Sequence, residues 1–264
     1  MLLEPVAPVR PIAAWIGGKR KLAKRLVARI NAIEHDSYVE PFVGMGGVFL
    51  RRDHRPPCEV INDWSEDVST LFRVIQRHFV AFTEMVRFQI SSRANFEKLV
   101  ATDPRTLTDL ERSARFLYLQ RLAFGGMVSV RRFGTSPGVG ARFDVTKVAP
   151  MIEALHERLA GVTIERLPWQ SLIARWDRPG TLFYLDPPYH GSERDYGADM
   201  FGRDQFAEMA AQLASIRGRF IMSINDHPEI RELFARFSIE EAETSYTVGG
   251  QAKAKTVREL IITG

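Results

Sequence analysis

The sequence predicts an α/β fold in which helices cover a mostly parallel β-sheet. Short apolar segments at 37–42, 59–62 and 181–185 have the length and composition of buried strands, and segments with helical apolar spacing lie between them. The first of these strands leads through a glycine turn, GMGG at 44–47, toward a helix. Strand, glycine turn, helix and second strand describe one βαβ unit, the building block of a parallel sheet.

The first half of the chain follows this alternation. The elements expected there are, in chain order, a helix within 19–33, a strand at 37–42, a short helix at 48–52 and a strand at 59–62. The helix within 19–33 is expected because its apolar residues share one face and its basic residues the other. The strand at 59–62 ends at Asp63, and Ser65 is expected to cap the helix that follows.

Residues 71–146 interrupt the alternation. They read as helical through the apolar stripe that contains Leu117 and Tyr118, and they end in RRFGTSPGVGARF at 131–143, which is rich in Gly and turn residues. We expect an arginine-bearing hairpin or loop there. The elements expected afterwards are a helix at 147–160, strands at 162–167 and 181–185, a helix at 204–217 stopped by Gly218, a strand at 220–224, a helix at 228–237, and strands near 239–247 and 257–263.

Composition excludes several classes of protein. Hydrophobic residues make up 45% and charged residues 26% of the chain, as in an ordinary globular protein, and no apolar run reaches membrane-spanning length. The N-terminal stretch carries Glu4 and prolines where a signal peptide would be apolar, so a cytoplasmic protein is expected. Cys58 is the sole cysteine and the six histidines lack ligand spacing, which predicts no disulfide and no metal.

Positive charge is concentrated in the first part of the chain. Residues 1–142 hold 22 Lys and Arg against 14 Asp and Glu, whereas residues 143–264 hold 14 against 18. Of the 36 basic residues, 29 are arginine, whose guanidinium suits bidentate contacts with phosphate and guanine. This pattern favours a polyanion partner, most simply nucleic acid.

The glycine turn after the first strand indicates a ligand site. Gly44 and Gly46 would let a ligand approach the backbone closely, and Asp63 at the end of the next strand suits contact with ribose hydroxyls. A dinucleotide fingerprint would need glycine at position 49, where the chain has Phe49, so a nicotinamide-dependent oxidoreductase is disfavoured.

A second motif, Asp186-Pro187-Pro188-Tyr189, follows the apolar strand at 181–185. It suits methylation of an exocyclic amine on a planar ring, because such an amine has a delocalised lone pair and is a poor nucleophile. The Asp186 carboxylate and the Pro187 carbonyl could accept its two hydrogens, while Tyr189 offers a stacking face. A base within duplex DNA must be rotated out of the helix to reach such a pocket.

Together these motifs resemble the Dam-type, D12 class DNA adenine-N6 methyltransferases of bacteria and their phages. The shared motifs are WIGGK (15–19), YVEPFVGMGGVFL (38–50), IND (61–63), SRANF (92–96), FLYLQR (116–121), DPPY (186–189), SIND (223–226) and ELII (259–262). The resemblance implies S-adenosylmethionine as cofactor, S-adenosylhomocysteine as product and double-stranded DNA as substrate. It also implies a Rossmann-like methyltransferase fold, with a seven-stranded, mostly parallel sheet that ends in an antiparallel hairpin. Residues 1–70 and 147–264 would form the catalytic domain, and 71–146 an inserted target-recognition domain.

The resemblance also assigns roles to individual residues. Those implied to bind the cofactor are Trp15, Lys19, Phe42, Gly44, Gly46, Asp63, Trp64 and Asp186. Within this set, Trp64 would pack on the cofactor adenine, and Asp186 would also touch the target amine. Tyr189 would stack on the flipped adenine. The implied setting is a monomeric or weakly dimeric cytoplasmic protein, associated with the nucleoid and encoded by a bacterium or phage.

Two departures bear on the recognition sequence. Relatives that read GATC usually carry a lysine where this chain has Ala14, and Asn-Gly where it reads Phe124-Gly125-Gly126. We therefore expect a short or relaxed recognition sequence, with arginine–phosphate contacts supplying most of the affinity. The residues expected to contact DNA are Arg121, Phe124, Arg131, Arg132 and Arg142.

Some alternatives stay open from the sequence alone. The Asp-Pro-Pro-Tyr pocket would also fit the N4 amine of cytosine, and a non-catalytic DNA-binding module could retain the fold. Asn225 and Asp226 end a strand near the predicted site, where they could either line it or cap a helix from the positions ahead of Pro228.

Overall fold

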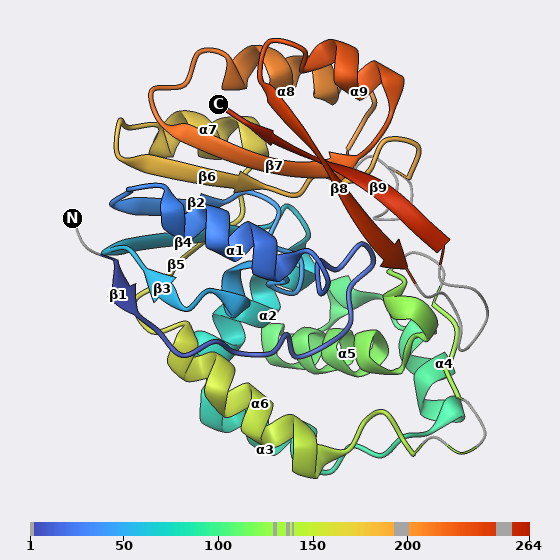
Figure 1. Cartoon of the computed structure of the whole chain (residues 1–264). Helices are drawn as coiled ribbons and strands as arrows, with labels where there is room; N and C mark the ends of the chain where they lie inside the picture. Colours follow the sequence, from blue (N-terminus) through green and yellow to red (C-terminus); the bar gives the residue numbers. More distant parts are fainter. Residues whose placement is uncertain (1–2, 129–130, 136–137, 139, 193–200, 247–254) are drawn as a thin grey trace.

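A seven-stranded sheet forms the centre of the computed structural model, which describes residues 3–128, 131–135, 138, 140–192, 201–246 and 255–264. The strands lie in the order β5-β4-β2-β6-β7-β9-β8 (Figure 1). Their bounds are β2 Ser37–Glu40, β4 Cys58–Asn62, β5 Thr163–Glu165, β6 Thr181–Leu185, β7 Arg219–Asn225, β8 Ser238–Tyr246 and β9 Lys255–Thr263. The first five run parallel, β9 pairs antiparallel with β7, and β8 pairs antiparallel with β9. The predicted sheet with its C-terminal antiparallel hairpin is thus confirmed.

The order of the strands locates the ligand-binding edge. The chain moves outward from β2 through β4 to β5, then returns to place β6 on the other side of β2. In parallel sheets, ligands bind at the carboxyl ends of the strands where the order reverses in this way. The Asn62 side chain fixes this edge, because its amide donates to the Pro41 carbonyl (2.9 Å) and accepts from the Leu167 backbone N–H (2.8 Å).

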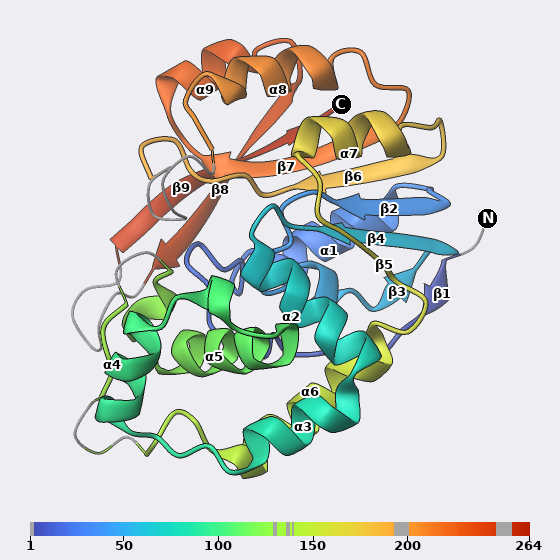
Figure 2. The ribbon, with the colours of Figure 1, turned by 180° about the vertical axis from the view of Figure 1, so that it is seen from behind.

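Helices cover both faces of the sheet. Their bounds are α1 Ala23–Ala32, α2 Glu66–Arg77, α3 Phe79–Arg87, α4 Arg93–Ala101, α5 Asp109–Leu122, α6 Val145–Arg158, α7 Trp169–Trp176, α8 Gln205–Leu213 and α9 Pro228–Leu233. On one face, α7, α8 and α9 pack on sheet residues that include Phe183 (Figure 1). On the other face, α1 and the helices α2 to α6 share a single buried cluster with sheet residues such as Ile61 and Tyr184 (Figure 2). Alternate residues of each buried strand therefore belong to different cores.

The helices of 71–146 share the core of the sheet. Phe72 from α2, Phe116 from α5 and Val148 from α6 belong to the same buried cluster as Ile61 of β4. The boundary expected at residue 70 falls inside α2, and the one expected at residue 146 falls in the first turn of α6. At the start of α5, Thr108 and Glu111 form a capping box that fixes the helix start.

Several local expectations differ from the structure. The short helix at 48–52 is one 3₁₀ turn, Phe49–Arg51, and α8 ends at Leu213, before Gly218. Ser65 is the N-cap of α2, but its side chain makes no capping bond; instead its backbone N–H donates to Asp63 Oδ1. The sequence pattern did not predict α7 or the small antiparallel pair β1 (Glu4–Pro5) and β3 (His54–Arg55). None of the helices in the described part of the chain has the length and apolar character of a bilayer span.

Candidate active site

A cavity of about 860 Å³ opens at the carboxyl ends of β2, β4 and β6. Its wall includes Glu40 at the end of β2, Asp63 after β4 and Asp186 after β6, together with the N-terminal segment 10–20. This volume is in the range of pockets that enclose a small organic ligand. The cavity therefore lies at the edge that the strand order predicts for ligand binding.

The glycine turn after β2 is tied to Asp63 across one wall of the cavity. Gly44 N–H donates to Asp63 Oδ2 at 2.9 Å, and Ser65 N–H donates to Asp63 Oδ1 at 2.9 Å. Burial raises the pKa of Asp63 to about 6, although the two backbone hydrogen bonds lower it. Each carboxylate oxygen of Asp63 has a further lone pair, so the group can also accept hydroxyl donors from a ligand.

Gly44 has a second constraint. Its φ of +51° lies in the left-handed region that favours glycine, and a Cβ there would stand 2.6 Å from Nε1 of Trp15. The indole of Trp15 thus packs directly on the glycine turn, and it also meets Phe116 of α5 edge-on. Gly46 is different, because a Cβ there would meet Leu50 and the residue does not line the cavity. Its φ of +73° shapes the turn.

The Asp186 carboxylate lines the cavity and is held by two side chains. Its Oδ1 is 2.6 Å from Nζ of the buried Lys19 and accepts a hydrogen bond from the Ser223 hydroxyl at 3.2 Å. Lys19 Nζ also donates to the Tyr189 hydroxyl at 2.7 Å, so one ammonium bridges the first and last residues of the Asp-Pro-Pro-Tyr motif. Burial raises the pKa of Asp186 to about 6; Lys19 lowers it and Glu259 raises it. The carboxylate is 22% exposed, toward the cavity that it lines.

Glu40 is a cavity residue to which the sequence motifs assigned no role. It is buried, and its Oε2 accepts a hydrogen bond from the Tyr38 hydroxyl at 2.7 Å. Burial raises the pKa of Glu40, the hydrogen bond from Tyr38 lowers it and the charge of Asp186 raises it, which together place it at about 8. The sequence signal that could have pointed to Glu40 as a site residue is its position near the end of the first predicted strand, just before Pro41.

The other predicted cofactor residues lie around the same space. Trp64 is 44% exposed beside Asp63 and lines the cavity, as does Phe42, which packs edge-on against Phe201. Pro188 also lines the cavity, whereas Pro187 and Tyr189 do not. The structure thus brings seven of the eight predicted cofactor residues to one cavity, all but Gly46.

Five arginines contribute positive charge to the lining of the cavity. The five are Arg10, Arg20, Arg51, Arg121 and Arg142. Arg51 donates to the Gly47 carbonyl, and burial together with the positive charge of Arg20 lowers its pKa. Arg121 of α5 donates to the carbonyls of Ile12 and Arg142, so it joins the N-terminal segment to the end of the glycine-rich loop.

The residues predicted to contact DNA occupy different environments. Residues 122–124 and 132–134 form the two paired sides of a hairpin, in which Ala123 pairs with Phe133 and Phe124 N–H donates to the Arg132 carbonyl at 2.8 Å. Phe124 is 42% exposed and Arg132 is exposed, which suits contact with a partner. Arg131 instead packs over the ring of Phe116 at 5.6 Å, and burial lowers the pKa of its guanidinium to about 10.

Asn225, the last residue of β7, and Asp226 after it do not line the cavity and have structural partners. The Asn225 side chain accepts from the His190 backbone N–H (2.9 Å) and donates to the His190 carbonyl (3.0 Å), which clamps the chain just after Tyr189. Asp226 pairs with Arg231, and the residue that caps α9 is His227.

Comparisons with known proteins identify the family of the chain. The model of the D12 class N6 adenine-specific DNA methyltransferases matches residues 15–248. The Type II methyltransferase M.CviBI of Paramecium bursaria Chlorella virus NC1A is 23% identical, with 90% of this chain and 91% of the relative covered. The DNA adenine methylase of Haemophilus influenzae is 24% identical, with 98% of this chain and 95% of the relative covered.

One solved structure is a more distant match. A Pyrococcus horikoshii protein described as a candidate RNA methyltransferase has a TM-score of 0.41 at 10% identity, over 92% of this chain and 80% of that one. The family model, by contrast, covers most of the chain and names the N6 amine of adenine, which disfavours the cytosine-N4 and non-catalytic alternatives. The chain therefore belongs to the D12 class of N6 adenine-specific DNA methyltransferases.

Proposed function

We propose that the cavity binds S-adenosylmethionine and that Asp186 and Tyr189 present the N6 amine of a flipped-out adenine in duplex DNA to its methyl group. The observation that carries the proposal is that Gly44, Asp63 and Asp186 line one cavity, in which Gly44 N–H donates to Asp63. These residues follow β2, β4 and β6, the three strands around the point where strand order reverses.

The cavity residues fit this cofactor. Asp63 is held by two backbone N–H groups and retains lone pairs for ribose hydroxyls, and the exposed indole of Trp64 beside it offers a face for adenine. Gly44 permits close approach to the backbone, and Phe42 is placed to border the methionine part. Bound S-adenosylmethionine supplies an electrophilic methyl group and leaves as S-adenosylhomocysteine.

Asp186 and the Pro187 carbonyl act on the amine. Two acceptors on the N6 hydrogens draw the nitrogen lone pair out of conjugation and orient it, which makes a poor nucleophile competent. Ser223 holds Oδ1 of Asp186, which supports a fixed carboxylate orientation. Lys19 bridges Asp186 and the Tyr189 hydroxyl, so it positions both ends of the motif for an aromatic base.

Residues 71–146 form the DNA-recognition segment in this proposal. The exposed Phe124 and Arg132 belong to the hairpin whose base packs on the N-terminal segment, since Gln120 donates to the carbonyls of both Ala14 and Gly126. Ala14 is exposed and carries only a methyl group toward the cavity rim, which supports a relaxed recognition sequence. Arg132 and Arg142 then supply affinity through phosphate contacts.

Methyl transfer from tritiated S-adenosylmethionine to unmethylated duplex DNA tests the proposal. After digestion to nucleosides, we expect label in N6-methyladenine, with methylation at more than one sequence context. Label in N4-methylcytosine would overturn the choice of base, and methylation confined to GATC would overturn the relaxed specificity. Absence of label despite duplex binding would overturn the activity itself.

A further inference from the structure

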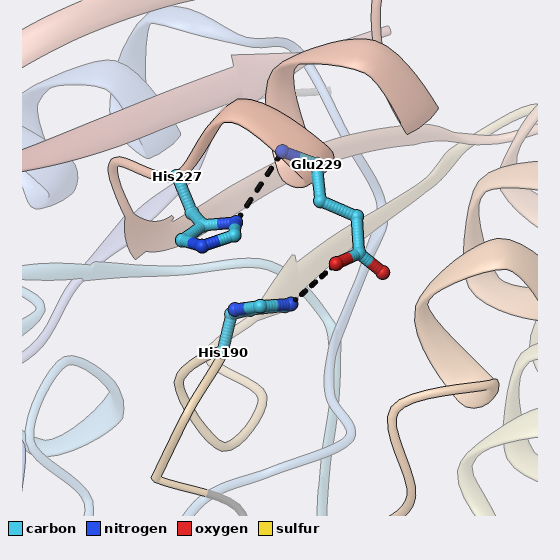
Figure 3. Close-up of side chains that lie close together, drawn as sticks. All are labelled: His190, His227 and Glu229. Carbon is cyan, nitrogen blue, oxygen red and sulfur yellow. Dashed lines mark hydrogen bonds and ion pairs between the residues drawn. The ribbon is translucent and has the colours of Figure 1, made fainter.

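Three side chains able to bind a metal ion gather beside the Asp-Pro-Pro-Tyr motif. His190 follows Tyr189 in the chain, and His227 and Glu229 lie at the start of α9 (Figure 3). One ligand atom from each residue lies within 4.8 Å of the others. The sequence spacing did not predict this cluster, because 36 residues separate the two histidines along the chain. None of the three residues lines the cavity.

The surrounding structure holds the cluster in place. His190 is buried, and Asn225 binds both its backbone N–H and its carbonyl. The imidazole rings of His190 and His227 stack with centroids 3.8 Å apart, and His227 Nδ1 accepts the backbone N–H of Glu229 at 3.3 Å. Asn225 thus sets the backbone at His190 before any ion arrives, which lowers the cost of ordering that ligand. The stacked rings are inclined by only 24°, so one of them has to turn before both nitrogen lone pairs face the same ion.

The hydrogen bonds of His190 do not balance. Its Nε2 lies 2.9 Å from Glu229 Oε2 and 3.0 Å from Nε of Arg203. If Nε2 of a neutral ring carries hydrogen, it faces the N–H donor of Arg203; if it does not, its lone pair faces the Glu229 carboxylate. In either tautomer, one of these short contacts therefore joins two hydrogen-bond donors or two hydrogen-bond acceptors. A cation that accepts lone pairs from both His190 and Glu229 removes the conflict.

We propose that His190, His227 and Glu229 bind a divalent transition-metal ion of the Zn²⁺ type, with water completing its coordination. Two imidazole nitrogens and one carboxylate oxygen form a ligand set that suits Zn²⁺, whereas Mg²⁺ and Ca²⁺ favour oxygen alone. In the metal-free structure, Arg203 supplies the positive charge beside His190 and Glu229. Its side chain is 62% exposed, so it can move outward when the metal binds. The bound ion ties the segment after Tyr189 to α9. This inference does not rest on the proposed methyl transfer.

Zn²⁺ titration of the metal-free full-length protein against a chromogenic chelator tests the site. We expect one equivalent to bind, and His227→Ala and Glu229→Gln each to weaken binding about 100-fold or more, since even outer-shell losses reach 10–100-fold. His78→Ala is the matched control, because His78 is exposed between α2 and α3. Unchanged affinity in both cluster variants, or loss of affinity in the control, would overturn the proposal. Thermal unfolding of each variant confirms that it is folded.

Two further variants test whether the ion binds at this cluster and displaces Arg203. Arg203→Ala removes the competing cation without touching a ligand, so it should bind Zn²⁺ several-fold more tightly than the wild type. Equal or weaker binding would contradict the exchange of Arg203 for metal. Cys58→Ser should bind as the wild type does, since the thiol takes no part; loss of binding there would assign the ion to Cys58 instead.

Discussion

The raised pKa of Asp186 predicts how methylation depends on pH. In the proposed mechanism the carboxylate must be ionised to accept the hydrogens of the target amine, and burial raises its pKa to about 6. Activity should therefore be full above that pH and fall as the pH is lowered through it. With a pKa near 6, about 3% of the group is protonated at pH 7.5, about half at pH 6 and about 90% at pH 5. We expect a roughly tenfold loss of rate between pH 7.5 and pH 5.

The assay is kcat/KM for duplex DNA at saturating S-adenosylmethionine, measured from pH 5 to pH 8 at constant ionic strength. With the cofactor saturating, Asp63 is engaged by its ligand, so the profile reports Asp186. Equilibrium binding of S-adenosylmethionine over the same range is the control for Asp63, whose pKa is also about 6. A rate that stays level down to pH 5, or a midpoint near pH 4, would refute the inference that the buried, ionised Asp186 accepts the hydrogens of the target amine.

Three other predictions concern single substitutions. Asp186→Ala should abolish turnover and leave duplex affinity within about threefold, because phosphate contacts dominate binding; equal loss of both in a filter-binding assay would contradict this. Gly44→Ala should weaken S-adenosylmethionine binding at least tenfold in calorimetry. The alanine would have to adopt a φ of +51°, which costs about 1–2 kcal/mol, and its Cβ would stand 2.6 Å from Trp15. Gly140→Ala, whose Cβ would lie in open space, should bind normally. Arg132→Ala should lower the slope of log affinity against log salt by about 1, and an unchanged slope would remove it from the interface.

The sequence predicted the strands of the sheet better than the contacts between helices and loops. β6 agrees residue for residue with 181–185, because five buried residues, four of them apolar or aromatic, stop at Asp186-Pro187. Of the eight residues that the shared motifs implied for the cofactor, seven line the cavity, and their binding role stays a prediction. Arg131 could not be distinguished from Arg132 in the sequence, since only the three-dimensional packing places one over Phe116 and leaves the other exposed.

Contacts between residues far apart in the chain could not be predicted from the sequence for a related reason. The clustering of His190 with His227 depends on β6 and β7 ending side by side, which periodicity does not reveal. The raised pKa of Glu40 depends on burial at the end of β2, and a lone glutamate in an apolar strand gives no sign of its neighbours. Local patterns report the periodicity of an element, whereas ligand geometry arises from the pairing of elements.

The single core shared by the sheet and the helices α2 to α6 limits how this enzyme can acquire new sequence preferences. A recognition unit with its own core could be exchanged between relatives as a cassette. Here a graft of 71–146 would cut α2 in mid-helix and expose apolar side chains that pack under β4. New specificity in this chain should therefore evolve through substitutions on the hairpin and the N-terminal rim, within an unchanged helical frame.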